Sequence, residues 1–192
     1  MNKLDHTGTD RLRKGRFSIP GALYFITACT KTRKPGLTTE TVSGALIEAL
    51  RELHQSTAIS LHCATVMPDH IHSLFTLGRT LTLSQTQGKF KRLTKSVLQP
   101  SGLEWQENYY DHRIRQDGFI EPFARYIFMN PYRKKLIPIS ERWPTWVLNR
   151  NYRPEFHQHL IDESYPPAKW LENGETAKSL IQQDLLENKV DN

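Results

Sequence analysis

The sequence predicts a single α+β domain with a mostly antiparallel sheet, flanking helices and an irregular C-terminal tail. Its 192 residues are enough to bury one core. Segments of β-forming residues alternate with segments of helical apolar spacing, in the order strand, helix, strand, strand, helix, strand, helix. The apolar runs are shorter than the ~20 residues that span a membrane, and the N-terminus lacks the apolar core of a signal peptide. We therefore expect a cytoplasmic protein with no membrane partner.

The first half of the chain alternates between strand and helix patterns. Residues 22–30 are rich in β-forming side chains and follow a Pro-Gly turn, which predicts the first strand. After a basic loop, apolar residues recur at helical spacing across 38–54, which predicts the first helix. Residues 59–67 and 70–77 then predict two strands joined by a tight Pro-Asp turn. We expect these two strands to pair as a hairpin.

The second half adds two helices and one strand before its pattern loosens. Residues 82–98 predict a helix with a basic face, and residues 108–115 predict a short strand. A third helix is expected over 118–129, because Pro131 disfavours the helical conformation in the residue before it. The remaining chain is rich in proline and tryptophan, which indicates an irregular wrap anchored by aromatic side chains. A last helix is expected over 175–190.

Basic and acidic residues are unevenly distributed along the chain. The formal net charge is +6, but residues 1–36 and 79–99 are strongly basic, whereas residues 162–192 are acidic. A basic surface usually contacts phosphate groups, which favours a polyanionic partner, although charged faces also keep proteins soluble. The candidate DNA contacts in the basic segments are Arg11, Arg13, Lys14, Arg16, Lys31, Arg33, Lys34, Lys89, Lys91, Arg92 and Lys95.

His70 and His72 are separated by one residue at the start of a predicted strand. Side chains alternate along a strand, so both imidazoles leave the same face while Ile71 points into the core. Two such imidazoles can hold one divalent ion when a third ligand comes from elsewhere; otherwise they are two solvent-facing histidines. The segment 157–159 repeats the His-x-His spacing, but a glutamine stands at its centre and its surroundings are not strand-like.

The third predicted helix carries the missing groups. Tyr126 and Asn130 stand at i and i+4, hence on one helix face. The Asn130 carboxamide oxygen would complete a ligand set with two imidazoles, and without a thiolate this set suits Mg²⁺ or Mn²⁺. A tyrosine one turn away could serve as nucleophile if a cation or base helps it ionise. Alternatively, Tyr126 is a core aromatic and Asn130 a helix-terminal residue; Tyr109 and Tyr110 better suit strand packing or base stacking.

Two sequence blocks resemble a known family, the single-tyrosine HUH nucleases, and specifically its REP-associated tyrosine transposases. The first block is His70-Ile71-His72 with the preceding Met-Pro-Asp. The second begins at Trp105 with the letters WQENYYDHRIR and ends at residues 126–131, YIFMNP. The blocks occur in the expected order and separation, and the resemblance extends from about Arg16 to Trp146.

This resemblance implies a ferredoxin-like, RRM-like fold with the histidine pair on a central strand and the tyrosine on a following helix. Family members cut single-stranded DNA beside a small hairpin through a 5′-phosphotyrosine intermediate. By correspondence, Tyr126 would be the nucleophile, and His70, His72 and Asn130 would bind the metal. His112 and Arg115, in the second block, join the candidate DNA contacts, and a structural role is the alternative for His112.

The resemblance also implies a domain organisation and a partner. We expect a basic arm at 1–16, the nuclease domain at 17–146 and an extension of open role at 147–192. The expected partner is single-stranded DNA with REP-like hairpins, bound by a nucleoid-associated monomer or homodimer without a small-molecule cofactor. The alternative is a non-catalytic regulator that binds nucleic-acid hairpins on the same fold.

Overall fold

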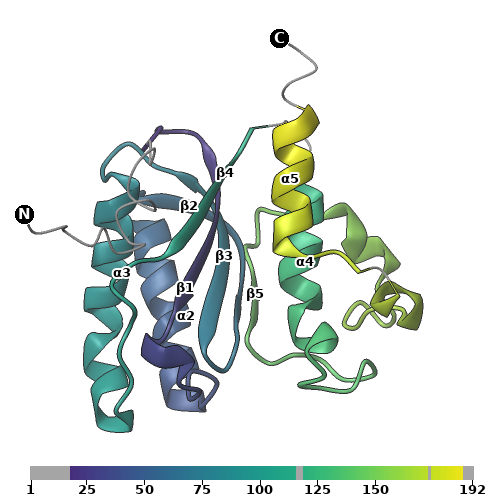
Figure 1. Cartoon of the computed structure of the whole chain (residues 1–192), viewed down its shortest axis with the longest axis horizontal. Helices are drawn as coiled ribbons and strands as arrows, with labels where there is room; N and C mark the ends of the chain where they lie inside the picture. The colour runs from purple at the N-terminus through teal and green to yellow at the C-terminus, as the bar shows by residue number, and fades with distance from the viewer. Residues whose placement is uncertain (1–17, 116–118, 173, 188–192) are drawn as a thin grey trace, which may run out of the picture.

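A five-stranded antiparallel sheet lies between two layers of helices in the computed structural model of the chain (Figure 1). The structure describes residues 18–115, 119–172 and 174–187. The strands are β1 (Leu23–Cys29), β2 (Ile59–Val66), β3 (His70–Leu77), β4 (Tyr110–Ile114) and β5 (Trp146–Leu148). The α-helices are α2 (Glu40–Gln55), α3 (Leu83–Leu98), α4 (Ile120–Arg133) and α5 (Ala177–Glu187). Short 3-10 helices are η1 (Lys31–Arg33), η2 (Gln99–Ser101), η3 (Glu155–His159) and η4 (Ala168–Leu171).

The strand order β4-β1-β3-β2-β5 confirms the predicted α+β fold. Every strand pair is antiparallel, and α2 and α3 connect the strands of a ferredoxin-like β-α-β-β-α-β unit. The predicted hairpin is present: β2 pairs with β3 after the turn at Pro68-Asp69. Strand β3 therefore lies at the centre of the sheet, and both of its faces are covered.

Alternating side chains of β3 belong to two separate cores. Ile71 and Phe75 point towards α2 and α3, into a first core with Leu46, Leu50 and Phe90. Leu74 points to the other face, where α4 and the C-terminal segment pack. The second core there includes Phe25, Phe123, Ile127, Phe128 and Trp170. Because His70 and His72 have the register of Leu74, they lie at the α4-facing surface of the sheet.

Helix α4 does not end where the sequence pattern predicts. The expected end at residue 129 is wrong, because α4 continues through Pro131 to Arg133. Proline lacks the N–H that would bond to the Ile127 carbonyl, but the backbone N–H of Lys134 still donates to the Asn130 carbonyl at 3.0 Å. Met129 and Tyr132 are buried in the second core on either side of the proline. This packing compensates for one lost backbone hydrogen bond.

The C-terminal segment packs against α4 rather than leaving the domain (Figure 1). Its aromatic residues Phe156 and Trp170 are buried in the second core, as the prediction of an aromatic-anchored wrap requires. The three-residue strand β5 was not predicted; it spans the expected domain boundary at 146, which stays a prediction. Helix α5 falls within the last predicted helix. Within the described ranges, each helix falls short of the length and apolarity needed to cross a membrane.

Candidate active site

The side chains of His70 and His72 converge at the start of β3. Their Nε2 atoms lie 3.1 Å apart, and the two ring centroids are 4.6 Å apart. Both residues are buried, with exposed fractions of 8% and 4%. The alternation of β3 places both rings on one face, and α4 covers that face. The two nitrogens that could bind an ion therefore point at the same small volume.

The opposite ring nitrogens are held by other side chains. His70 Nδ1 lies 2.6 Å from Asp69 Oδ1, and His72 Nδ1 lies 2.8 Å from Thr27 Oγ1. Thr27 directly opposes His72 in the β1–β3 register, which explains the second contact. Arg33 Nε lies 3.4 Å from the other oxygen of Asp69. These partners orient both imidazoles with Nε2 directed inward, as the supporting groups of metal-binding histidines do.

Burial determines the protonation of the two imidazoles. It lowers the pKa of His72 well below its ordinary value of 6.5, and the positive charges of Arg33 and Lys134 add to the effect. Burial also lowers the pKa of His70, and it outweighs the opposing effect of Asp69. Both rings are therefore neutral at neutral pH. Neutral imidazole is the form that binds metal ions.

Asn130 adds a third possible metal ligand to the two histidines. Its Nδ2 lies 3.2 Å from His72 Nε2, while its Oδ1 is buried and lacks a hydrogen-bond partner among the described residues. The nitrogen and oxygen of a carboxamide can be exchanged by rotating the amide, so either atom can face His72. With Oδ1 turned inward, the amide would direct an oxygen at the same point as both imidazoles. That arrangement would give the buried oxygen a partner.

The three donors fit a single divalent ion. Neighbouring ligands that bind one ion at right angles, each about 2.1 Å from it, lie about 3 Å apart. The separations of 3.1 and 3.2 Å are close to this value. In the part of the chain that the structure describes, no group of three His, Cys, Asp or Glu side chains could hold a metal, so the candidate depends on Asn130. Two imidazoles, one amide oxygen and no thiolate suit Mg²⁺ or Mn²⁺.

Tyr126 lies one helical turn before Asn130, against the same histidine. Its ring centroid is 5.6 Å from that of His72 and 5.9 Å from that of Phe25. Burial raises the pKa of the Tyr126 phenol, while hydrogen bonds from the Asn130 side chain and the Ala177 backbone, and the charge of Arg133, lower it. The phenol is thus protonated at neutral pH. It needs a further cation to become a nucleophile.

Tyr126 and Asn130 line a pocket of about 490 Å³. Its other walls come from the end of α4 and from the C-terminal segment. The lining residues are Tyr126, Asn130, Tyr132, Arg133, Lys134, Lys135, Leu171, Gly174, Glu175 and Thr176. This volume suits a nucleotide-sized group. Three cationic side chains and one carboxylate surround it, so the pocket favours an anion.

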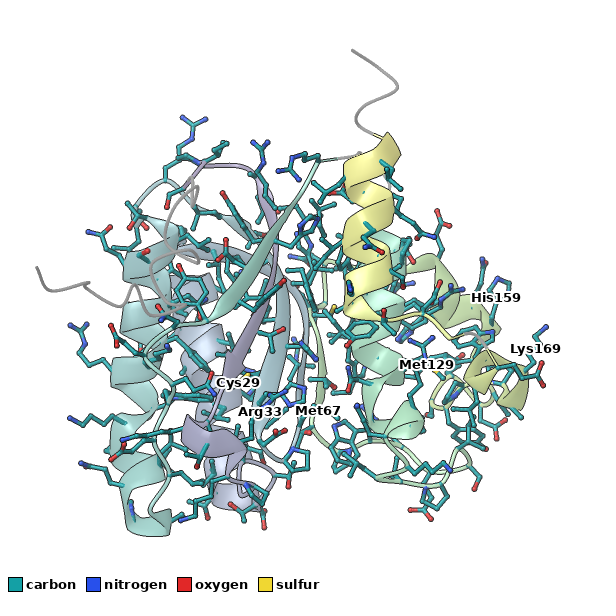
Figure 2. All side chains as sticks on the ribbon, viewed as in Figure 1. Cys29, Arg33, Met67, Met129, His159 and Lys169 are labelled. Carbon is teal, nitrogen blue, oxygen red and sulfur yellow. The ribbon has the colours of Figure 1, made fainter. Side chains whose placement is uncertain are left out.

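The predicted DNA contacts differ in their surroundings. Arg11, Arg13, Lys14 and Arg16 lie outside the described residues. Arg33 is at the site itself; Figure 2 labels it beside Cys29 and near Met67 at the lower end of the sheet, and its Nη1 lies 2.9 Å from Cys29 Sγ. Arg92 and Lys95 are exposed on α3. Arg92 and Lys95 are therefore open to a nucleic acid, and Arg33 is close to the site.

Four other predicted contacts already have partners in the chain. Lys31 pairs with Glu104 at 3.0 Å, and Lys89 pairs with Glu52 at 3.0 Å. The Lys34 ammonium group donates to the backbone carbonyls of Ser101 and Gly102. The Lys91 ammonium group donates to the backbone carbonyls of residues 106–108. Lys34 therefore holds the loop after η1 to η2, Lys91 holds residues 106–108 to α3, and both are less free to bind phosphate.

His112 and Arg115 hold the C-terminal helix. His112 is buried on β4, and its Nε2 lies 2.7 Å from Asp184 Oδ2 on α5. The Arg115 backbone N–H donates to the other oxygen of Asp184 at 3.1 Å. Burial lowers the pKa of His112, against the raising effect of Asp184. His112 is thus in a structural position, which was one of its two expected roles.

Sequence reasoning missed several residues around the site. Asp69 precedes the histidine pair directly, and Arg133 follows Asn130 by three residues on the same helix, so their spacing could have revealed them. Thr27 and Glu175 reach the site only through strand register and tail packing, which no local pattern shows. The look-alike His157–His159 lies in η3, and Figure 2 labels His159 on the far side of α4 from the sheet.

This chain is similar in sequence to known proteins. Residues 19–130 match the family model described as Transposase IS200 like. A REP-associated tyrosine transposase of Escherichia coli (strain K12) is 23% identical over 138 residues, covering 71% of this chain and 82% of that protein. A Haemophilus influenzae protein with a provisional assignment to the same group is 24% identical over 152 residues, covering 71% and 85%.

A solved structure adds evidence on the fold. It is the structure of a REP-associated tyrosine transposase bound to a REP hairpin, with a TM-score of 0.58 and 22% identity, covering 68% of this chain and 79% of that one. The family match spans more than half of the chain, includes His70, His72 and Tyr126, and ends at Asn130. The chain therefore belongs to the IS200-like transposase family, in which it resembles the REP-associated tyrosine transposases.

Proposed function

We propose that the protein is a metal-dependent single-strand DNA endonuclease and strand transferase that acts at hairpin-forming REP-like repeats. The convergence of His70, His72 and Asn130 beside Tyr126 carries this proposal. Similarity to proteins named for REP repeats, one of them solved with a REP hairpin, supports the hairpin as substrate. Such a substrate would place the protein at the nucleoid, with the basic arm and residues 17–146 engaging DNA.

In the proposed reaction Tyr126 attacks the scissile phosphate. A divalent ion held by His70 Nε2, His72 Nε2 and Asn130 Oδ1 would act as a Lewis acid on that phosphate. Tyr126 Oη forms a bond to phosphorus and loses its proton to solvent, while the P–O3′ bond breaks. The leaving O3′ takes up a proton as a 3′-hydroxyl, and the 5′-phosphate stays on the tyrosine. The 3′-hydroxyl of a second strand can then attack the 5′-phosphate on the tyrosine. This attack forms a new P–O3′ bond and releases the Tyr126 phenol.

The surrounding residues prepare the site for this step. Asp69 and Thr27 hold the imidazoles in one orientation, so little reorganisation is needed when an ion binds. Arg33 compensates the charge of Asp69. The edge-on packing of the Tyr126 ring against the stacked Phe25 and His72 rings fixes the direction from which the phenol approaches a phosphate in the pocket.

Incubation with hairpin DNA tests the proposal. The substrate is a labelled oligonucleotide with flanking single strand, copied from inverted repeats beside the coding gene. With Mg²⁺ or Mn²⁺ we expect cleavage and a covalent protein–DNA adduct, both abolished by EDTA and by Tyr126→Phe. Absence of cleavage with every such repeat and both ions would contradict the enzymatic proposal.

The alternative is a non-catalytic regulator that binds hairpins. One observation favours it: burial raises the pKa of the Tyr126 phenol, which disfavours the ionised form that would attack a phosphate. A regulator would bind the same hairpin equally well with Mn²⁺ and with EDTA, and would form no adduct. The assay described above therefore distinguishes the two functions.

A further inference from the structure

Arg133 shares one face of α4 with the proposed catalytic residues. Tyr126, Asn130 and Arg133 stand at i, i+4 and i+7, positions that lie above one another on a helix. All three line the 490 Å³ pocket. Arg133 is close enough to Tyr126 for its charge to affect the phenol. A guanidinium group therefore lies on the pocket wall beside the proposed nucleophile.

Glu175 is the present partner of Arg133, but it leaves part of the guanidinium group without a hydrogen bond. Its Nη1 donates to the Glu175 carbonyl at 3.2 Å, and its Nη2 lies 3.4 Å from Glu175 Oε2. Its side chain is only 15% exposed, and its buried Nε lacks a partner among the described residues. Arg125 makes a much shorter contact, 2.7 Å, to the other oxygen of the same carboxylate. Glu175 is thus shared by two guanidinium groups and is bound more closely by Arg125.

The charge around the pocket is therefore unbalanced. Arg133, Lys134 and Lys135 line it, and Glu175 is the acidic residue among the lining residues. That carboxylate also neutralises Arg125, which lines a different pocket beside Glu121. A buried guanidinium without full compensation is costly unless an anion binds it. The pocket consequently has the charge, the donors and the volume for a phosphodiester group.

We infer that Arg133 binds the non-bridging oxygens of the scissile phosphate and that Glu175 holds its place until DNA enters. This inference rests on the proposed function, because it assigns a catalytic residue to that reaction. The planar guanidinium donates two parallel hydrogen bonds to phosphate, which an ammonium group cannot reproduce. Arg133 would thereby offset the charge that develops on the phosphate while Tyr126 attacks.

The binding half of the inference can be tested without turnover. The metal-free protein is titrated with a short single-stranded thymidine oligonucleotide while the arginine Nε–H signals are followed by ¹⁵N NMR, with Arg133 assigned from Arg133→Lys. We expect the Arg133 signal to shift with saturation and the Arg125 signal to stay. Glu175→Gln should tighten binding by about threefold to tenfold, since it removes a competing charge. An Arg133 signal that stays fixed at saturation overturns the inference.

The catalytic half uses adduct formation by the wild-type protein. Arg133→Gln should lower the single-turnover rate by about 100-fold, the usual effect of losing one oxyanion donor, with a much smaller change in DNA affinity. Arg133→Lys should recover part of the rate, and Arg125→Gln, which removes the other guanidinium that binds Glu175 but does not itself line the pocket, should change it by less than about threefold. Equal losses in the two Gln variants would mean that Arg133 only tethers the tail. No adduct with the wild-type protein, together with a shifting Arg133 signal, would reject the proposed function but retain the phosphate site.

Discussion

Asn130 Nδ2 lies 3.2 Å from His72 Nε2, although 58 residues separate the two along the chain. The alternation of β3 fixes His72, whereas Asn130 reaches it only because α4 packs on the same sheet face through the second core. The candidate metal site is therefore a product of tertiary packing between a strand and a helix. Changes to groups that hold either side chain in place should weaken metal binding before they unfold the protein.

Thr27→Val should weaken metal binding by about 10- to 100-fold, as loss of a supporting group typically does. Valine preserves the shape and the β-branch, but it removes the hydroxyl that lies 2.8 Å from His72 Nδ1. Isothermal titration with Mn²⁺ measures the affinity, and a urea melt in EDTA checks that the fold is retained.

Thr65→Val is the matched control for this change. Thr65 opposes His72 from the other neighbouring strand, β2, and its buried hydroxyl lacks a partner among the described residues. Replacing it should leave Mn²⁺ affinity within about twofold and should not lower stability, because an unsatisfied polar group is removed. Equal affinity losses in the two variants would show that Thr27 acts through packing alone.

The metal-free protein should lose stability as the pH falls below about 6.5. Burial lowers the pKa of both His70 and His72 in the folded state, so the unfolded chain binds more protons in this range. The neutral imidazoles contribute their full stability when the pH is above the histidine pKa of the unfolded chain. This stability is lost as the pH falls towards the lower pKa values of the folded state. Urea unfolding in EDTA at about pH 7.5 and 5.5 measures the effect. The His72→Gln variant should lose less stability between the two pH values than the wild-type protein. An equal loss would show that His72 does not contribute to the pH dependence.

Asp184→Ala should destabilise the protein by about 3 kcal/mol, because the buried carboxylate accepts two hydrogen bonds and each hydrogen bond to a charged group contributes about 1.5 kcal/mol or more. The carboxylate is fully buried, 2.7 Å from His112 Nε2 and 3.1 Å from the Arg115 backbone nitrogen. Leu186→Ala on the same helix is the control, because Leu186 is 62% exposed and should change the free energy of unfolding by less than about 0.5 kcal/mol. A small effect of Asp184→Ala would mean that α5 contributes little to folding.

Local patterns predicted most of the fold because each ferredoxin-like element has its own signal. The His70 and His72 face follows from strand alternation, and the Tyr126–Asn130 face from helical spacing. The end of α4 was not predictable, since burial of Met129 and Tyr132 outweighs the local effect of Pro131. Strand β5 was missed because three residues give no periodicity.

The rest of the site depends on contacts between distant segments. Thr27 supports His72 through sheet register, and Glu175 reaches Arg133 through the path of the tail. Neither contact has a counterpart in local sequence. The candidate ligands and nucleophile could thus be named from the sequence, whereas the residues that orient and compensate them required the structure.

The most direct measurement is mass spectrometry of the protein–DNA adduct after digestion with trypsin and nuclease. The protein is incubated with the hairpin oligonucleotide and Mn²⁺, and the modified peptide is sequenced. We expect a 5′-phosphonucleotide on Tyr126, in the peptide that ends at Arg133 or at Lys134, and no adduct in Tyr126→Phe or in EDTA. Modification at Tyr109 or Tyr110, or cleavage that persists in Tyr126→Phe, would contradict the assignment of Tyr126 as the nucleophile.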